Sequence, residues 1–173
     1  MAKQTIFGRI AQLAKANINA LLDAAEDPQK MLDQMVRDYT NSIREAEAAV
    51  AQTIGNLRLL EKDHAEDLKE AQEWGAKALA ASNKADELRT AGDTANADKF
   101  DNLAKVALGK QMQAEKAAQA LEPQLASQTQ VVNQLKDGLD KMRTKLDELK
   151  YKRDELTSRQ KTPTAQSQVN DAL

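Results

Sequence analysis

Apolar residues recur in alternating steps of four and three over most of this 173-residue chain, and this spacing constrains the fold more than any other feature. The repeat runs through residues 32–88, stops, and resumes through residues 100–156. A seven-residue repeat of this kind places its apolar positions on one stripe of an α-helix, and that stripe is buried when two helices pack as a coiled coil. The sequence therefore predicts two long helices, each with one buried seam.

The composition agrees with helices packed along a thin seam. Alanine accounts for 30 of the 173 residues, whereas aromatic residues make up only 3%. A globular core is normally built from large side chains, and alanine is the best helix former. The net charge of −2 gives the chain no electrostatic reason to bind nucleic acid. The absence of cysteine excludes disulfides and thiolate chemistry, and it favours a reducing compartment.

The interruption at residues 90–94 has the composition of a tight turn. Gly92 is suited to the left-handed conformation that ends many helices, and Asp93 can cap the helix that follows. Upstream, Asp27 can cap a helix for which Pro28 is a favourable first residue. We therefore expect an all-α fold: a long antiparallel two-helix coiled-coil hairpin, with arms at about 28–90 and 94–160, preceded by a short N-terminal amphipathic helix.

The first 22 residues form a separate amphipathic unit. All of its charges are basic (Lys3, Arg9 and Lys15), since every Asp and Glu of the chain follows residue 22. On a single helix spanning residues 3–22, Asn17 is the one polar residue on the apolar half. The large apolar residues of that half are Ile6, Phe7, Ile10, Leu13, Ile18, Leu21 and Leu22.

Two interpretations of this unit remain open. A basic amphipathic helix is suited to an anionic membrane surface, with Arg9 and Lys15 beside the apolar face. We then expect it to be loosely ordered in water and to become fully helical on a bilayer. Alternatively, its apolar face packs on the hairpin or on another protein.

The boundaries that follow are 1–24 for the amphipathic helix, 25–160 for the hairpin and 161–173 for a polar, aperiodic linker or tail. A linker at the end suggests a truncated chain. No window of about 18 or more continuous apolar residues is present, so we expect no membrane-spanning helix. The N-terminus also lacks the continuous apolar stretch of a secretory signal.

No pattern in the sequence indicates catalysis, a cofactor or a metal site. His64 is the only histidine, and without a second histidine or a cysteine it has no partner for a metal. It falls on the seam, where a polar residue helps to fix register. The acidic residues alternate with lysine and arginine on the outer heptad positions, as expected of a solvated face. The chain is therefore predicted not to be an enzyme.

Three stretches give the chain a family resemblance. They are Ile6-Phe7-Gly8-Arg9, Lys15-Ala16-Asn17-Ile18-Asn19-Ala20-Leu21-Leu22 and Ala25-Glu26-Asp27-Pro28-Gln29-Lys30-Met31. Together with the hairpin behind them, they resemble the phage-shock protein A family, which includes the vesicle-inducing protein of plastids. The diagnostic part is residues 6–31, and the resemblance extends over nearly the whole chain.

The resemblance implies a peripheral protein related to ESCRT-III. Family members lie on the inner, cytoplasmic face of the membrane, self-assemble into rings or rods, and protect or remodel stressed membranes. Their N-terminal helix binds lipid, which here corresponds to the apolar set above with Arg9 and Lys15. In some members the hairpin restrains an AAA+ transcription activator, so a soluble regulator is the alternative function. Family members also continue into at least one further helix, which puts ring or rod formation by this chain in doubt.

Overall fold

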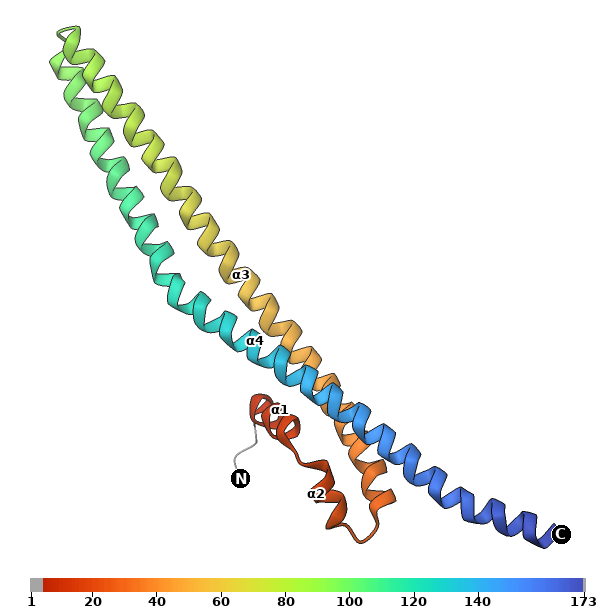
Figure 1. Cartoon of the computed structure of the whole chain (residues 1–173). Helices are drawn as coiled ribbons and strands as arrows, with labels where there is room; N and C mark the ends of the chain where they lie inside the picture. The colour runs from red at the N-terminus through yellow and green to blue at the C-terminus, as the bar shows by residue number, and fades with distance from the viewer. Residues whose placement is uncertain (1–4, 173) are drawn as a thin grey trace. The chain divides into compact units, whose positions relative to one another are not determined.

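The computed structural model describes the backbone of residues 5–172 and the side chains of residues 5–159, and it contains four helices in this range (Figure 1). They are α1 (Ile6–Lys15), α2 (Ile18–Asp23), α3 (Pro28–Thr90) and α4 (Thr94–Ala172). The described residues contain no β-strand. The long helices α3 and α4 are antiparallel and pack against each other, so the all-α hairpin predicted from the seven-residue repeat is confirmed.

Local hydrogen bonds account for the turn between α3 and α4. The amide of Asp93 donates to the carbonyl of Leu88 at 2.9 Å, and the amide of Gly92 donates to the carbonyl of Arg89 at 3.0 Å. This pair of bonds is the Schellman arrangement, which requires a positive φ at the residue after the helix. Gly92 meets the requirement with a φ of 82°.

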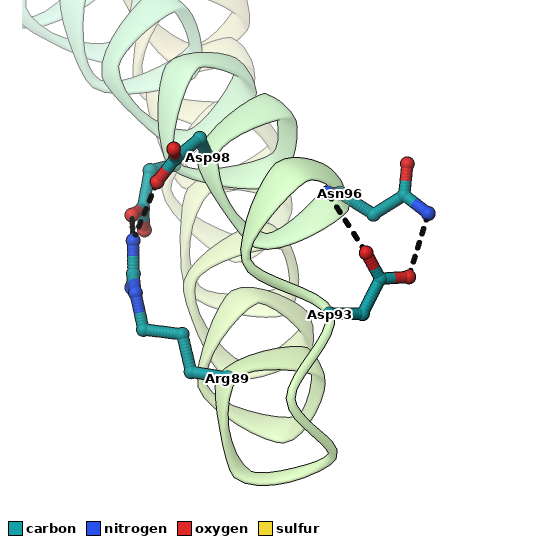
Figure 2. Close-up of polar contacts among 5 residues, drawn as sticks. Arg89, Asp93, Asn96 and Asp98 are labelled. Carbon is teal, nitrogen blue, oxygen red and sulfur yellow. Dashed lines mark hydrogen bonds and ion pairs between the residues drawn. The ribbon is translucent and has the colours of Figure 1, made fainter.

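Side chains on both sides stabilise the same turn (Figure 2). Asp93 caps α4, because its Oδ1 accepts from the amide of Asn96 at 3.2 Å and its Oδ2 accepts from the Asn96 side chain at 2.7 Å. Arg89, at the end of α3, forms ion pairs with Asp98 and Asp101 of α4. The bond to the Asn96 amide satisfies a backbone group that would otherwise be left unpaired at the start of α4, and the ion pairs join the two helix ends.

The start of α3 is built in the same way. Pro28 is its first residue, where a missing N–H costs no hydrogen bond. Asp27 precedes it, and its Oδ1 accepts from the amide of Lys30 at 3.2 Å. A helix of 63 residues therefore begins at a capped corner.

The chain divides into two compact units, which are described separately. One unit is residues Ile54–Gln130, and it contains the turn and the adjoining parts of α3 and α4. Its buried seam is made almost entirely of alanine: Ala71, Ala78, Ala85, Ala97, Ala104, Ala107, Ala114 and Ala118. His64 is half-buried on this seam, 3.9 Å from Glu122, and its Nε2 has no hydrogen-bond partner.

The other unit is Met1–Thr53 with Val131–Leu173, and its seam uses larger side chains. The buried set is Leu32, Val36, Tyr39, Ile43, Ala46 and Val50 from α3, and Val132, Leu135, Leu139, Met142 and Leu149 from α4. Arg143 of α4 also pairs with Glu47 of α3 at 2.9 Å. Most of these side chains are larger than alanine, and the same unit includes α1 and α2.

The end of the chain differs from the sequence-based expectation. The pattern predicted a linker or tail at residues 161–173, whereas α4 continues as a helix to Ala172. The seven-residue repeat ends near residue 156, but the backbone of a long helix can continue without a buried stripe because its hydrogen bonds are local. The side chains of residues 160–173 lie outside the described part of the structure.

Candidate functional site

The N-terminal segment begins with a capped, basic amphipathic helix. The Oγ1 of Thr5 accepts from the amide of Gly8 at 3.2 Å, which fixes the start of α1. Lys15 lies in the last turn, where a positive charge complements the helix dipole. Lys3, the third basic residue of the segment, lies outside the described residues.

The segment is two helices, and the prediction of a single helix through residues 3–22 is wrong. Ala16 ends α1 with an extended backbone (φ −60°, ψ 136°), and Asn17 is also extended (φ −90°, ψ 96°). The side chain of Asn17 accepts from the amide of Ala20 at 3.1 Å, so it caps α2. Asn17 was the polar residue that did not fit the apolar half of one helix, and capping is a common role for asparagine.

The structure places most of the predicted membrane-binding apolar residues against the hairpin. Ile10 and Ile18 are buried, with 4% and 1% of their surface exposed. Ile6, Leu13 and Leu22 are half-buried, whereas Phe7 and Leu21 are 46% and 44% exposed. A segment loosely ordered in water was expected, but in this structure it is helical and docked, which is the hairpin-packing alternative left open by the sequence.

Both N-terminal helices pack on one buried cluster of the hairpin. Ile18 belongs to a buried cluster with Leu32, Val36 and Tyr39 of α3 and Leu149 of α4. Leu22 and Leu13 pack on the edge of this cluster. Because this cluster includes residues of both long helices, apolar packing ties α2 to the hairpin.

Further contacts hold α1. A β-carbon built on Gly138 of α4 would lie 2.6 Å from Cγ2 of Ile10, so the side chain of Ile10 occupies the space over this glycine. The hydroxyl of Tyr39 donates to the carbonyl of Leu13 at 2.8 Å. The guanidinium of Arg9 pairs with the carboxylate of Glu45 at 2.6 Å.

The two polar contacts of α1 differ in burial, since the Tyr39 hydroxyl is buried and the Arg9–Glu45 ion pair is half exposed. Burial raises the pKa of the Tyr39 hydroxyl, and the nearby charge of Glu148 raises it further, so the hydroxyl keeps its proton and donates to Leu13. The Arg9–Glu45 pair is half exposed, at 44% and 55% of the two side chains. Exposed ion pairs of this kind contribute about 0–1 kcal/mol.

A groove of about 570 Å³ lies between α1 and α4. Its apolar lining includes Phe7, Ile10 and Leu135, and Lys15 and Lys141 lie among its polar residues. The groove shows that α1 covers its part of the hairpin incompletely.

Sequence reasoning missed the hairpin residues that receive α1. Tyr39 lies within the seven-residue repeat, which predicts no partner for its hydroxyl, and Glu45 is one of the acidic residues that were expected on a solvated face. No role was predicted for Gly138. A glycine inside a helix costs about 1 kcal/mol relative to alanine, which is the one local signal that something approaches the backbone there.

The described part of the chain contains no cluster of three or more histidine, cysteine, aspartate or glutamate residues that could hold a metal ion. Within the same range, no helix combines the length and apolar character needed to cross a bilayer.

Comparison with known proteins gives consistent matches. The Membrane-associated protein Vipp1 of Synechocystis sp. is 30% identical over 168 residues, which cover 97% of this chain and 58% of that protein. The Phage shock protein A homolog of Deinococcus radiodurans is 31% identical over 161 residues, which cover 93% of this chain and 66% of that protein. The chain thus spans about three fifths of the length of these curated relatives.

A chloroplastic VIPP1 from Arabidopsis thaliana is also similar, with 27% identity over 99% of this chain and 48% of that protein. The model of the PspA/IM30 family matches residues 5–173, which include the N-terminal segment and both arms of the hairpin. This match over nearly the whole chain, together with the curated relatives, shows that the protein belongs to the PspA/IM30 family.

Proposed function

We propose that the protein is a peripheral membrane-binding scaffold, with α1 and α2 as its lipid-contacting segment. The observation that carries this proposal is the segment itself, which combines a large apolar face with exclusively basic charge in its first 22 residues. The names of two relatives, a membrane-associated protein and a phage shock protein A homolog, support the same class of function.

The free energy of membrane binding is expected to have an apolar and an electrostatic contribution. Full burial of each large apolar side chain in a bilayer contributes roughly 1.5–3 kcal/mol, and each basic residue near an anionic surface adds about 1 kcal/mol. The charge term weakens as salt rises, whereas the apolar term persists. We therefore expect binding at the anionic inner face of the cytoplasmic membrane.

The remaining parts of the proposal rest on the family resemblance. They are self-assembly with other copies of the chain and maintenance or remodelling of the membrane under envelope stress. No catalytic step, cofactor or nucleic-acid partner forms part of the proposal. Electron microscopy of the protein with and without anionic vesicles tests the assembly, which should be visible as regular particles on or beside the vesicles. Unassembled protein in both samples would contradict this part.

Phe7→Glu tests the membrane contact by co-sedimentation with anionic phospholipid vesicles. Phe7 is 46% exposed, so the change removes little folded packing but places a charge on the proposed lipid face. Leu79→Glu is the matched control, because Leu79 is a 63% exposed apolar residue on α3 in the other unit. We expect Phe7→Glu to lose vesicle binding and Leu79→Glu to keep it.

Lys15→Glu tests the charge term. It reverses one exposed charge, so it should weaken binding roughly thirtyfold on anionic vesicles at low salt, and far less on zwitterionic vesicles. If Phe7→Glu sediments with vesicles as well as the unmodified protein does, the N-terminal segment is not the lipid contact. That result would favour the alternative function, in which the protein is a soluble coiled coil that binds and restrains a partner such as an AAA+ transcription activator.

A further inference from the structure

The part of the hairpin next to the turn combines positive charge with exposed apolar surface. Residues 74–85 of α3 and residues 102–114 of α4 together contain four lysines and no aspartate or glutamate, although the whole chain has a net charge of −2. The same two segments hold five of the ten large hydrophobic side chains that are exposed among the described residues. Contiguous apolar surface with charge of one sign is typical of a site that binds a partner.

Contacts at both ends place the two segments side by side. At one end, Lys77 of α3 and Lys110 of α4 both lie over the ring of Trp74, with their Nζ atoms 4.3 and 4.5 Å from the ring centroid. At the other end, Arg89 pairs with Asp101. No carboxylate of the described residues lies within ion-pair distance of either lysine over the ring. Two ammonium groups without an acidic partner therefore meet at one edge of the hairpin.

The seven-residue repeat extends this edge toward the turn. Lys84 follows Lys77 by seven residues and Leu103 precedes Lys110 by seven, which is about two helical turns in each case. Val106 lies between Leu103 and Lys110 at spacings of three and four, so it shares their stripe. Leu103 and Val106 are 56% and 57% exposed. We call this surface the basic edge, and its residues are Trp74, Lys77, Lys84, Leu103, Val106 and Lys110.

Acidic residues limit the length of the lysine stripe on α3. Glu73 lies four residues before Lys77, and Glu87 lies three residues after Lys84 and pairs with it at 3.6 Å. Positions 73 and 87 are separated by about 21 Å along a helix. A broad anionic bilayer would meet both carboxylates together with the lysines and would be repelled by them. A helix about 10 Å wide can cross the edge between them, so a helix is the better fit.

We propose that the basic edge docks an acidic amphipathic helix of a partner protein. The apolar face of that helix covers Leu103 and Val106, and its carboxylates pair with Lys77, Lys84 and Lys110. The ring of Trp74 already holds two of these ammonium groups, so less side-chain freedom is lost when a carboxylate binds them. This docking does not depend on membrane binding by the N-terminal segment.

A pair of synthetic helical peptides without tryptophan tests the proposal on the full chain. The first has leucine on one face and glutamate on the other, and the second has lysine in place of every glutamate. Binding is measured by the fluorescence anisotropy of a fluorescein label on the peptide. Trp74 is the only tryptophan of the chain, so its emission reports contact at the basic edge when unlabelled peptide is added. We expect the acidic peptide to bind and to change this emission, and the basic peptide to do neither.

Two substitutions with matched controls locate the site. Val106→Glu should weaken binding of the acidic peptide roughly tenfold or more, and Lys77→Glu should weaken it roughly fivefold. Leu59→Glu is the apolar control, since Leu59 is 63% exposed in the same unit but outside the basic edge. Lys69→Glu is the charge control, because Lys69 is exposed on α3 and also lies outside the edge. Both controls should bind the peptide as the unmodified protein does.

Lys15→Glu separates this docking from the proposed membrane function. It should weaken binding to anionic vesicles and leave peptide binding unchanged, whereas Val106→Glu should do the reverse. The proposal is overturned if the unmodified protein does not bind the acidic peptide, or if Val106→Glu and Leu59→Glu bind it equally. It is also overturned if Val106→Glu loses vesicle binding instead, since the edge would then contact a bilayer. None of these results would remove the lipid contact proposed for the N-terminal segment.

Discussion

The contact between Ile10 and Gly138 makes the docking of α1 sensitive to a single methyl group on the hairpin. In Gly138→Ala the new β-carbon would lie 2.6 Å from Cγ2 of Ile10, which is too close for two non-bonded carbon atoms. Isoleucine is branched at Cβ and has few alternative rotamers, so the side chain cannot simply turn away. The variant should therefore displace α1 from α4 without any change in the sequence of α1.

The size of the effect follows from the burial of Ile10, which is 4% exposed. Full burial of an isoleucine side chain contributes roughly 1.5–3 kcal/mol, so losing it raises the released population about 10- to 100-fold. Alanine also stabilises a helix interior by about 1 kcal/mol relative to glycine. This gain offsets part of the lost burial, so the melting temperature should fall by less than the loss of Ile10 burial alone would cause.

Gly109→Ala is the matched control for this substitution. Gly109 also lies within α4, and a β-carbon there meets nothing within 4 Å. The control gains the same helix propensity without displacing a neighbour. Hydrogen exchange of the α1 amides measures the released population directly, and co-sedimentation with anionic vesicles measures its consequence.

We expect α1 to exchange about 10- to 100-fold faster in Gly138→Ala than in Gly109→Ala, with tighter vesicle binding by the first variant. Equal exchange of α1 in the two variants would refute the reasoning, because it would mean that the helix accommodates the methyl group without leaving its site. Faster exchange throughout α3 and α4 would refute it as well, since the damage would then be to the hairpin rather than to α1.

Three further predictions concern the hairpin and its contacts. Leu139→Ala should destabilise the protein by about 2–5 kcal/mol, because Leu139 is 5% exposed on the seam. Asp140→Ala should change the stability by about 0.5 kcal/mol or less; equal shifts in thermal denaturation would contradict the register. Tyr39→Phe removes the hydrogen bond to the Leu13 carbonyl and should speed exchange of α1 by roughly fivefold. Because the pKa of Tyr39 is raised on folding, its contribution to stability is full below about pH 10 and is lost as pH rises further. The free energy of unfolding of Tyr39→Phe should therefore fall less than that of the unmodified protein as pH rises above about 10. The same fall in both proteins would count against this role. The hydrogen bond from Arg89 holds the pKa of Asp101 below its usual value, so its contribution is present above about pH 4 and lost as pH falls through the lowered pKa. An NMR titration should show the pKa of Asp101 returning toward its usual value in Arg89→Gln, and an unchanged pKa would contradict the assignment.

The sequence by itself determined the hairpin, because the signals that specify it are local or periodic. Seven-residue spacing places Leu32 and Leu139 on buried stripes whatever the partner helix, and both are buried in the structure. The turn depends on residues next to one another, since a positive φ at Gly92 and a cap from Asp93 close it within a few positions. Neither requires knowledge of distant parts of the chain.

Some local features were present in the sequence but were interpreted incorrectly. Asn17 ends the amphipathic pattern of one helix and caps the next, so the break at residues 16–17 could have been predicted from its preference for capping. The polar stretch after residue 160 indicated a linker, yet α4 continues through it. Loss of a buried stripe says where packing ends, and a helix backbone can extend beyond that point.

Only the tertiary structure decided where the apolar face of the N-terminal segment lies. A bilayer and the apolar surface of a hairpin attract the same side chains, so amphipathic spacing cannot distinguish them. The choice depends on Gly138, 128 positions from Ile10, and on Glu45, 36 positions from Arg9. Contacts at such separations carry no periodic signal in the sequence, because they form only after α3 and α4 have packed against each other.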